Sequence, residues 1–218
     1  MTSNLELVGQ QAIAYLDEKH AARERALPRT RSAIRSCANS IRATHRQDFS
    51  SARRLLDEAG RLLSEIAADL RQHQDIFYAG FVQDAQKEFA EAATFLALTR
   101  NEPLPLAPEL AIDWAPYLNG LGEAVGELRR YVLDQLRRNR VAESEIYLQQ
   151  MDDIYALLIT IDFPDAVTGG LRRTTDAARA ILEKTRGDLT VAVGQAQLQH
   201  SLAAFQEDLR KQEELRRK

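Results

Sequence analysis

Apolar residues recur every three or four positions along most of the chain, which is the spacing that places side chains on one face of an α-helix. Between positions 114 and 139 this stripe consists of Leu118, Leu121, Val125, Leu128, Val132 and Leu136. No segment shows the strict alternation of a β-strand, and no segment repeats another. The pattern therefore predicts an all-α fold.

Breaks in the pattern divide the chain into helices. Pro28 either kinks the first helical stretch or begins the second, and Gly187 marks a break before the last. A further helix follows Gly169 and Gly170 and ends near Thr185. We expect the remaining helices over about 5–26, 29–46, 48–73, 75–99, 114–139, 143–162 and 188–216.

One loop stands out, over about 100–112, because it contains Pro103, Pro105 and Pro108. The helices on both sides of it look incomplete alone. We therefore expect a long loop inside one domain that spans 1–218, with a charged tail over about 211–218 that frays.

The composition fits a globular protein, with 44% hydrophobic and 28% charged residues. The single cysteine, Cys37, excludes an intramolecular disulfide, fits a reducing compartment and falls on an apolar face, so we expect it in the core. No apolar run approaches the ~18 residues of a membrane span, and no signal-peptide core is evident. We therefore expect a cytoplasmic protein without a membrane partner. The net charge of -3 decides nothing about nucleic acid.

Two predicted helices carry clusters of acidic residues, in which Glu88 and Glu123 have no basic residue one turn away. Asp84, Glu88 and Glu91 follow spacings of four and three, and Glu123 and Glu127 lie four apart. Like charges at these spacings destabilise a helix by ~0.2–0.5 kcal/mol per pair. If the helices pack side by side, the four Glu carboxylates can converge, and Mg²⁺ and Mn²⁺ prefer such oxygen ligands. The alternative is two solvated faces. A ferritin-like di-iron site is disfavoured because no histidine completes a Glu-x-x-His motif.

A second group is basic. Arg31, Arg35, Arg42 and Arg46 share one side of a helix, over roughly 20 Å at ~1.5 Å per residue, and the stripe is extended by Arg29, Arg53 and Arg54. A one-sided arginine stripe suits a phosphate backbone, but a solvated face or salt bridges between helices would give the same pattern.

Three glycines lie inside a predicted helix, although each costs roughly 1 kcal/mol relative to alanine there. Gly120, Gly122 and Gly126 surround Glu123. Such glycines usually allow the close approach of another backbone or of a ligand, and the sequence leaves both alternatives open.

The two acidic segments resemble motifs of the translin family. Residues 87–95, Lys-Glu-Phe-Ala-Glu-Ala-Ala-Thr-Phe, are similar to the Q-E-Y-V-E-A-V-S-F segment of translin-associated factor X (TRAX). Residues 117–130 resemble that family's Y-L-x-G-x-x-D-x-x-G-E-L-x-R. Residues 171–173 and 183–188 resemble the end of prokaryotic translin-like proteins.

The resemblance implies a seven-helix fold that assembles into closed, hollow oligomers, such as an octamer-like shell, and binds single-stranded RNA or DNA. TRAX-like members are metal-dependent endoribonucleases. Their four catalytic acids fall on Glu88, Glu91, Glu123 and Glu127, which would hold Mg²⁺ or Mn²⁺. Glu123 replaces an Asp of the motif, which moves the carboxylate by about one methylene.

An RNA-contacting arginine of the motif falls on Arg130, and Arg35 is the best match to a basic family position, with Arg31 and Arg42 beside it. We therefore expect a homo-oligomeric endoribonuclease of the TRAX-like branch that hydrolyses single-stranded RNA. One alternative is a non-catalytic shell that binds single strands of RNA or DNA, and another is a helical scaffold without a nucleic-acid role.

Overall fold

The computed structural model describes residues 2–216, and within them it contains helices and no strand. The all-α fold class is thus confirmed. Where the resemblance implies seven helices, the described residues form six long helices and two of four residues each. The long ones are α1 (Thr2–His45), α2 (Phe49–Asp69), α4 (Gly80–Thr99), α5 (Trp114–Arg137), α6 (Val141–Leu158) and α8 (Leu171–Arg216); the short ones are α3 (Gln74–Phe77) and α7 (Asp165–Thr168).

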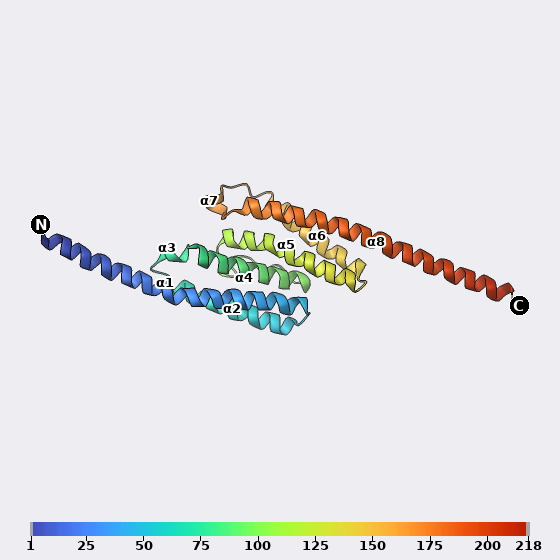
Figure 1. The fold of residues 1–218 in the computed structure, drawn as a ribbon, viewed down its shortest axis with the longest axis horizontal. Coiled ribbons are helices and arrows are strands. Elements are labelled where there is room, and N and C mark those ends of the chain that lie inside the picture. The colour runs from blue at the N-terminus through green and yellow to red at the C-terminus, as the bar shows by residue number, and fades with distance from the viewer. Residues whose placement is uncertain (1, 217–218) are drawn as a thin grey trace.

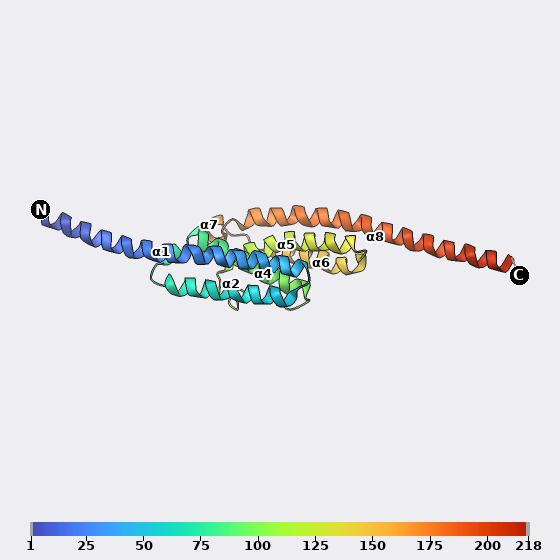
Figure 2. The ribbon, with the colours of Figure 1, turned by 60° about the horizontal axis from the view of Figure 1, so that its bottom comes forward.

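The long helices form a bundle in which α1 contacts α2 and α4, α4 contacts α5, and α5 contacts α6 and α8 (Figure 1). One apolar core runs through all six, with Phe95, Leu121 and Leu182 among its fully buried side chains. The first part of α1 and the last part of α8 extend beyond this bundle at opposite ends (Figure 2). The helices α4 and α5 therefore lie at the centre of the molecule.

The α2 helix shows how the local sequence sets these elements. The Asp48 side chain accepts a hydrogen bond from the Ser51 backbone N–H at 3.2 Å, which caps the helix. The following apolar residues then recur at helical spacing on the buried face: Ala52, Leu56, Ala59, Leu63 and Ile66.

Of the two alternatives at Pro28, the start of a new helix is wrong, because α1 continues through the proline. Proline removes one backbone donor, which leaves the Glu24 carbonyl without its usual partner. Glu24 and both its neighbours are exposed, so water can satisfy this carbonyl. The buried stripe of Ala22, Ala26 and Ala33 meanwhile continues across the proline. Tertiary packing on both sides therefore outweighs the local preference.

The break expected at Gly187 is also wrong, since α8 runs on to Arg216. Side chains beside the glycine tie this turn to other helices, because Arg186 pairs with Asp152 on α6 and Asp188 pairs with Arg129 on α5. The buried stripe also continues past it, through Ala178, Leu182, Thr185 and Leu189. In contrast, the helix expected over 75–99 is interrupted at Tyr78 and Ala79, between α3 and α4.

The proline-containing loop is confirmed, since no helix is present between Thr99 and Trp114. It is fixed to α5 by the Tyr117 hydroxyl, which donates to the Pro105 carbonyl at 2.9 Å. Cys37 is fully buried, as expected. No helix within residues 2–216 is both long and apolar enough to cross a membrane.

Candidate metal and nucleic-acid site

The acidic helices α4 and α5 meet at Gly120. A Cβ atom at this position would lie 2.5 Å from the Lys87 carbonyl oxygen and 2.9 Å from the Glu91 backbone nitrogen. Any side chain would therefore push the two backbones apart, so glycine sets their close approach. Because Lys87 and Glu91 flank Glu88, this contact brings the acidic turn of α4 against the start of the acidic turn of α5.

The other two glycines differ from each other. A Cβ atom at Gly122 would lie 2.4 Å from the Thr174 methyl group on α8, whereas one at Gly126 would meet only Ile181, at 3.9 Å. Gly122 thus lets α8 approach α5 beside Glu123. Gly126 is not required by any neighbour among the described residues.

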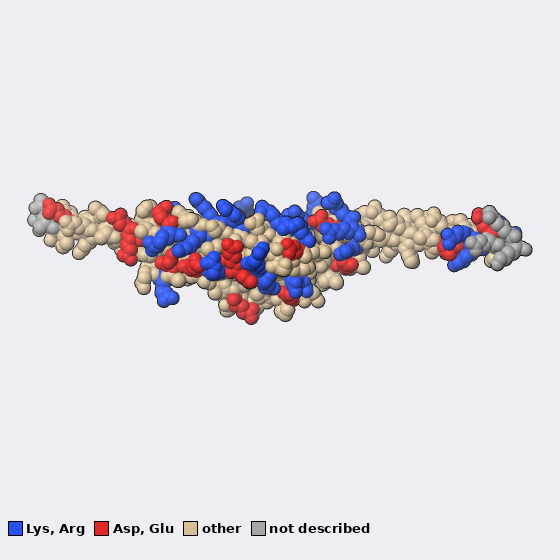
Figure 3. Space-filling model, turned by 90° about the horizontal axis from the view of Figure 1, so that it is seen from below, with Lys and Arg blue, Asp and Glu red and all other residues tan. Residues whose placement is uncertain are grey.

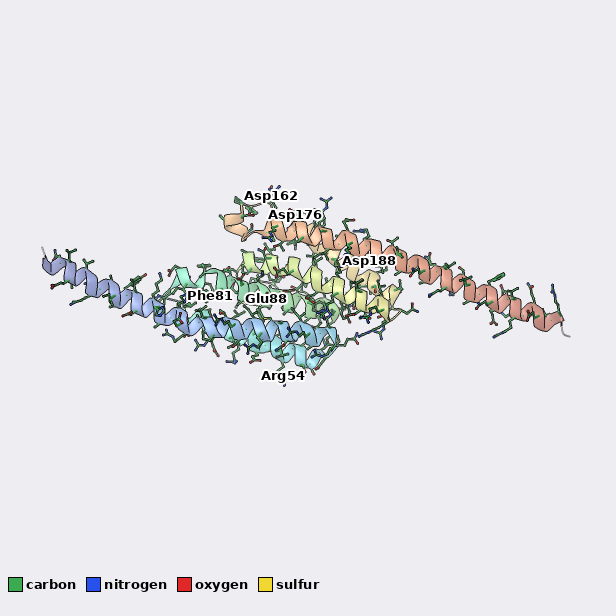
Figure 4. All side chains as sticks on the ribbon, in the orientation of Figure 1. Arg54, Phe81, Glu88, Asp162, Asp176 and Asp188 are labelled. Carbon is green, nitrogen blue, oxygen red and sulfur yellow. The ribbon has the colours of Figure 1, made fainter. Side chains whose placement is uncertain are left out.

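Three of the four predicted carboxylates come together across this contact. One oxygen from each of Glu88, Glu91 and Glu123 can be chosen so that all three atoms lie within 4.8 Å of one another. Glu88 and Glu91 project from adjacent turns of α4, and Glu123 reaches them from α5. Figure 4 places Glu88 on α4, inside the bundle and away from its projecting ends.

The crowding of these carboxylates changes their proton affinity. Burial raises the pKa of Glu91 to about 8, and the charges of Glu88, Glu123 and Glu127 add to the effect. Burial and the charge of Glu123 also raise the pKa of Glu88. Burial raises the pKa of the Cys37 thiol on α1, with a further contribution from Glu88 and Glu91. Burial and mutual repulsion therefore favour the protonated forms of Glu88 and Glu91 when no cation is bound.

The Glu123 carboxylate has a cationic partner on the neighbouring helix, which corrects the expectation that the acidic residues of the two helices are not neutralised. Lys87 Nζ lies 2.8 Å from Glu123 Oε1, across the two helices. Burial lowers the pKa of Lys87, but its hydrogen bond to Glu123 and the nearby acidic charges outweigh burial and leave the pKa raised. Spacing within one helix could not reveal this pair.

The fourth carboxylate, Glu127, lies outside the group of three and is held by a histidine. His45 Nε2, at the end of α1, is 2.5 Å from Glu127 Oε2. The His45 ring packs on Phe95, with 4.7 Å between ring centroids, and near Tyr131. Arg130 lies 3.9 Å from the same carboxylate. Sequence reasoning missed His45 because it is 82 residues from Glu127 and belongs to no recognisable motif.

The arginine stripe divides into paired and unpaired residues. Arg29 pairs with Asp69, and Arg53 pairs with Glu102. In contrast, Arg31, Arg35 and Arg42 are exposed and have no ion pair within residues 2–216, although Arg42 donates to Asn39. Salt bridges between helices therefore do not account for these three arginines. Arg130 is also exposed, on α5. Figure 3 shows basic and acidic side chains interleaved over one face of the bundle.

The group of three carboxylates fits a hard divalent cation. It supplies only oxygen donors, it holds them close together, and it lacks full neutralisation by nearby cations. Mg²⁺ and Mn²⁺ prefer this type of ligand, whereas zinc and iron sites usually include histidine or cysteine. Cys37 and His45 do not belong to the group.

Comparisons with known proteins agree with the fold and the length of the chain. No protein-family model matches it. An uncharacterized protein of Methanocaldococcus jannaschii is 33% identical over 199 residues, which covers 89% of this chain and 86% of that relative.

Among solved structures, AfC3PO, determined as a crystal structure and in a complex with duplex RNA, superposes with a TM-score of 0.78 at 32% identity. The match covers 84% of this chain and 95% of AfC3PO. Apo-NeC3PO, at a TM-score of 0.75 and 19% identity, shares the fold. Because AfC3PO is 32% identical to this chain over most of both chains, the two proteins belong to one family. The chain is therefore a member of the translin family, together with the C3PO proteins.

Proposed function

We propose that this protein is a metal-dependent endoribonuclease of the TRAX-like branch, which hydrolyses single-stranded RNA. The observation that carries the proposal is the convergence of Glu88, Glu91 and Glu123 from two helices onto one small volume. A purely structural role is a poor explanation, because burial, together with the neighbouring carboxylate charges, raises the pKa of Glu91 and so costs stability at neutral pH. Side chains with strongly shifted pKa values are frequently found at functional sites.

In this proposal, Glu88, Glu91 and Glu123 hold Mg²⁺ or Mn²⁺. When bound, the ion supplies positive charge at the scissile phosphate and activates a water nucleophile. Lys87 neutralises one oxygen of Glu123 and orients that carboxylate across the contact between α4 and α5. Glu123 is longer than the Asp of the family motif, and the Lys87 pair fixes where its extra length is directed.

Glu127 has a separate role in the proposal. It stands outside the group of three, yet its charge is close enough to raise the pKa of Glu88 and Glu91. The hydrogen bond from His45 fixes its carboxylate. Glu127 is therefore the carboxylate best placed to accept a proton from the attacking water as a general base.

Exposed arginines would hold the RNA strand. Arg130 lies beside Glu127, and Arg31, Arg35 and Arg42 have no acidic partner among the described residues. Unpaired guanidinium groups are free to bind phosphate oxygens, two at a time, without first breaking an ion pair. This predicts binding that weakens with salt and is largely independent of base sequence.

The test is cleavage of a labelled single-stranded RNA with Mg²⁺ or Mn²⁺, beside an EDTA control. Wild-type protein and Glu58→Gln, an exposed acid on α2, should cleave, whereas Glu88→Gln should not. Glu88→Gln should still bind RNA, and it should lose the rise in melting temperature that Mg²⁺ gives the wild type. Cleavage that persists in EDTA or in Glu88→Gln would contradict the proposal.

A second candidate function is RNA binding without hydrolysis, and the AfC3PO complex with duplex RNA favours including it. A matched duplex should therefore be assayed beside the single strand. If the protein binds duplex or single-stranded RNA, or single-stranded DNA, and cleaves none of them with either metal, the binding function stands and the glutamates have no catalytic role.

We also propose that the chain forms a closed homo-oligomer. The projecting ends of α1 and α8 expose large apolar side chains, such as Ile13 at 63% and Phe205 at 61%. Residues 189–206 of α8 contain no charged residue. Such surface is usually covered by a partner. Light scattering should give a mass several times that of one chain, and a monomer would contradict this assembly.

A further inference from the structure

A cavity of about 720 Å³ lies beside the carboxylate group, between α4, α5 and the first turns of α8. Lys87, Glu91 and Glu123 line it from α4 and α5, and Arg173 and Thr174 line it from α8. Its volume falls within the ~300–1,000 Å³ that is typical of small-ligand sites. The cavity is therefore large enough for more than a metal ion.

The wall that α8 contributes is fixed to α5 by hydrogen bonds. The Thr174 hydroxyl donates to Asn119 Oδ1 at 2.6 Å, and Asn119 Nδ2 donates to the Thr168 carbonyl at 2.8 Å. Gly169 and Gly170 have φ angles of 62° and 84°, which side chains rarely adopt, and they turn the chain into α8 at this point. Arg173, next to Thr174, is thus carried on a backbone whose position is defined.

Arg173 has no ion-pair partner among the described side chains. No carboxylate within residues 2–216 lies within ion-pairing distance of it, although three acidic residues line the same cavity: Asp84, Glu91 and Glu123. The other cation of the cavity, Lys87, is already paired with Glu123. Acidic and basic walls are therefore held apart with space between them, and the guanidinium remains available to an anion.

We propose that this cavity receives one nucleotide unit of the RNA strand, with Arg173 binding its phosphodiester. The inference deepens the proposed function and rests on it. Gly122, Ala115 and Ala177 leave room along the wall for the sugar and base. Arg173 would hold the phosphate on the side opposite the carboxylates, where planar guanidinium can bind two phosphate oxygens.

The adjacent residue provides a matched control. Arg172 is also exposed and carries the same charge, but it lines a different cavity, together with Asp162, Asp165 and Asp176. Figure 4 places Asp162 and Asp176 at the α7 end of the bundle. Replacing Arg172 or Arg173 by Gln changes the net charge equally, so only the position differs.

A second pair of variants tests the volume of the cavity. Ala177 lines the cavity, whereas Ala180, on the next turn of α8, does not. Both are exposed, so leucine at either position should be compatible with folding. Ala177→Leu should fill part of the cavity without altering its charge, and Ala180→Leu should leave it open.

The experiment measures binding of the dinucleoside monophosphate UpU to the full chain in EDTA, by calorimetry. UpU contains a single phosphodiester, so it reports on one nucleotide site. Arg173→Gln should weaken binding about tenfold, as loss of a charged hydrogen-bonding partner usually does. Ala177→Leu should also weaken it, while Arg172→Gln and Ala180→Leu should bind as the wild type does.

Several results would overturn the inference. They are no measurable UpU binding by the wild type, equal losses in Arg172→Gln and Arg173→Gln, or unchanged binding in Ala177→Leu. The proposed function has a separate readout, because it depends on whether Glu88→Gln loses cleavage of a long RNA. If that variant is inactive while Arg173→Gln and Arg172→Gln behave alike, the nuclease stands and the nucleotide site does not.

Discussion

The carboxylate group between α4 and α5 and the arginine stripe on α1 carry opposite charges and are built in opposite ways. Glu88, Glu91 and Glu123 come from two helices and meet only because those helices pack closely. Arg31, Arg35 and Arg42 lie on one helix and are exposed to solvent. The acids therefore depend on tertiary structure, whereas the stripe depends only on helical periodicity.

This difference determines how each region should respond to change. Crowded, partly buried carboxylates cost stability, and their geometry depends on neighbours such as Gly120 and His45. Exposed arginines cost little and contribute little to stability, so they can be removed singly without disturbing the fold. Variants of the first region should change folding and chemistry together, whereas variants of the second should change only RNA affinity.

The largest effect is expected at Gly120. Gly120→Ala should destabilise the protein by about 1–3 kcal/mol, because the added Cβ would overlap the α4 backbone. Gly126→Ala is the matched control, since its Cβ would have ordinary contact with Ile181 and should stabilise the helix by up to ~1 kcal/mol. Urea denaturation measures both. If the two variants shift stability in the same direction, close helix contact is not what Gly120 provides.

His45→Ala should have the next largest effect, with a loss of about 2 kcal/mol from the cavity left beside Phe95 and Tyr131 and from the lost bond to Glu127. The cleavage rate should also fall, because Glu127 is no longer held. His45→Gln, which can still donate to Glu127, should recover part of that rate. His20→Ala, at an exposed position on α1, is the control for both measurements. Equal rates in His45→Ala and His20→Ala would show that His45 does not position Glu127.

The pH dependence of stability should report on Glu91. Its pKa rises from 4.5 to about 8 on folding, so the folded state binds more protons than the unfolded state between these values. Stability of the metal-free protein should therefore fall as pH rises through this window. Glu91→Gln should flatten the fall and raise the melting temperature at pH 8 by ~2–4 °C, or about 1 kcal/mol.

Glu58→Gln, an exposed acid on α2, should keep the wild-type profile. Saturating Mg²⁺ should also reduce the fall with pH in the wild type, because metal binding favours the deprotonated carboxylates. Thermal melts in EDTA and in Mg²⁺, across pH 5–9, make both comparisons. A metal-free protein whose stability rises steadily between pH 5 and pH 8 would contradict the raised pKa.

The same contrast between regions explains what the sequence could predict. The all-α class, the proline-containing loop and the identity of the core residues can be predicted from periodicity and composition, because both are properties of the local sequence. Gly120 and Gly122 were recognisable as sites of close approach, but whether backbone or ligand approached them depended on the packing of α4 and α8. Pro28 and Gly187 misled because buried stripes on both sides hold α1 and α8 together across them.

At the site, helical spacing indicated which carboxylates share a face, but not which atoms meet. The pairing of Lys87 with Glu123 and of His45 with Glu127 joins residues 36 and 82 positions apart. No local signal marks such pairs, since they are set by how whole helices pack. The packing of α1, α4 and α5 therefore decides that Glu127 meets His45, while Glu88, Glu91 and Glu123 meet one another.

The smallest effect on stability, and the sharpest on binding, is expected from the arginine stripe. Replacing Arg31, Arg35 and Arg42 together by Gln should change stability by no more than ~0.5 kcal/mol per site, because none has an ion pair among the described residues. If all three contact phosphates, the slope of log affinity for single-stranded RNA against log salt should fall by ~2.

The control is a triple variant with the same charge change at exposed, unpaired arginines scattered over the molecule, Arg25, Arg71 and Arg179. A charge effect without a defined binding path would lower affinity similarly in both triple variants, whereas a continuous phosphate-binding stripe lowers the slope only in the first. Fluorescence anisotropy over a salt series separates these outcomes, and equal slopes would limit the RNA path to Arg130 and the carboxylate group.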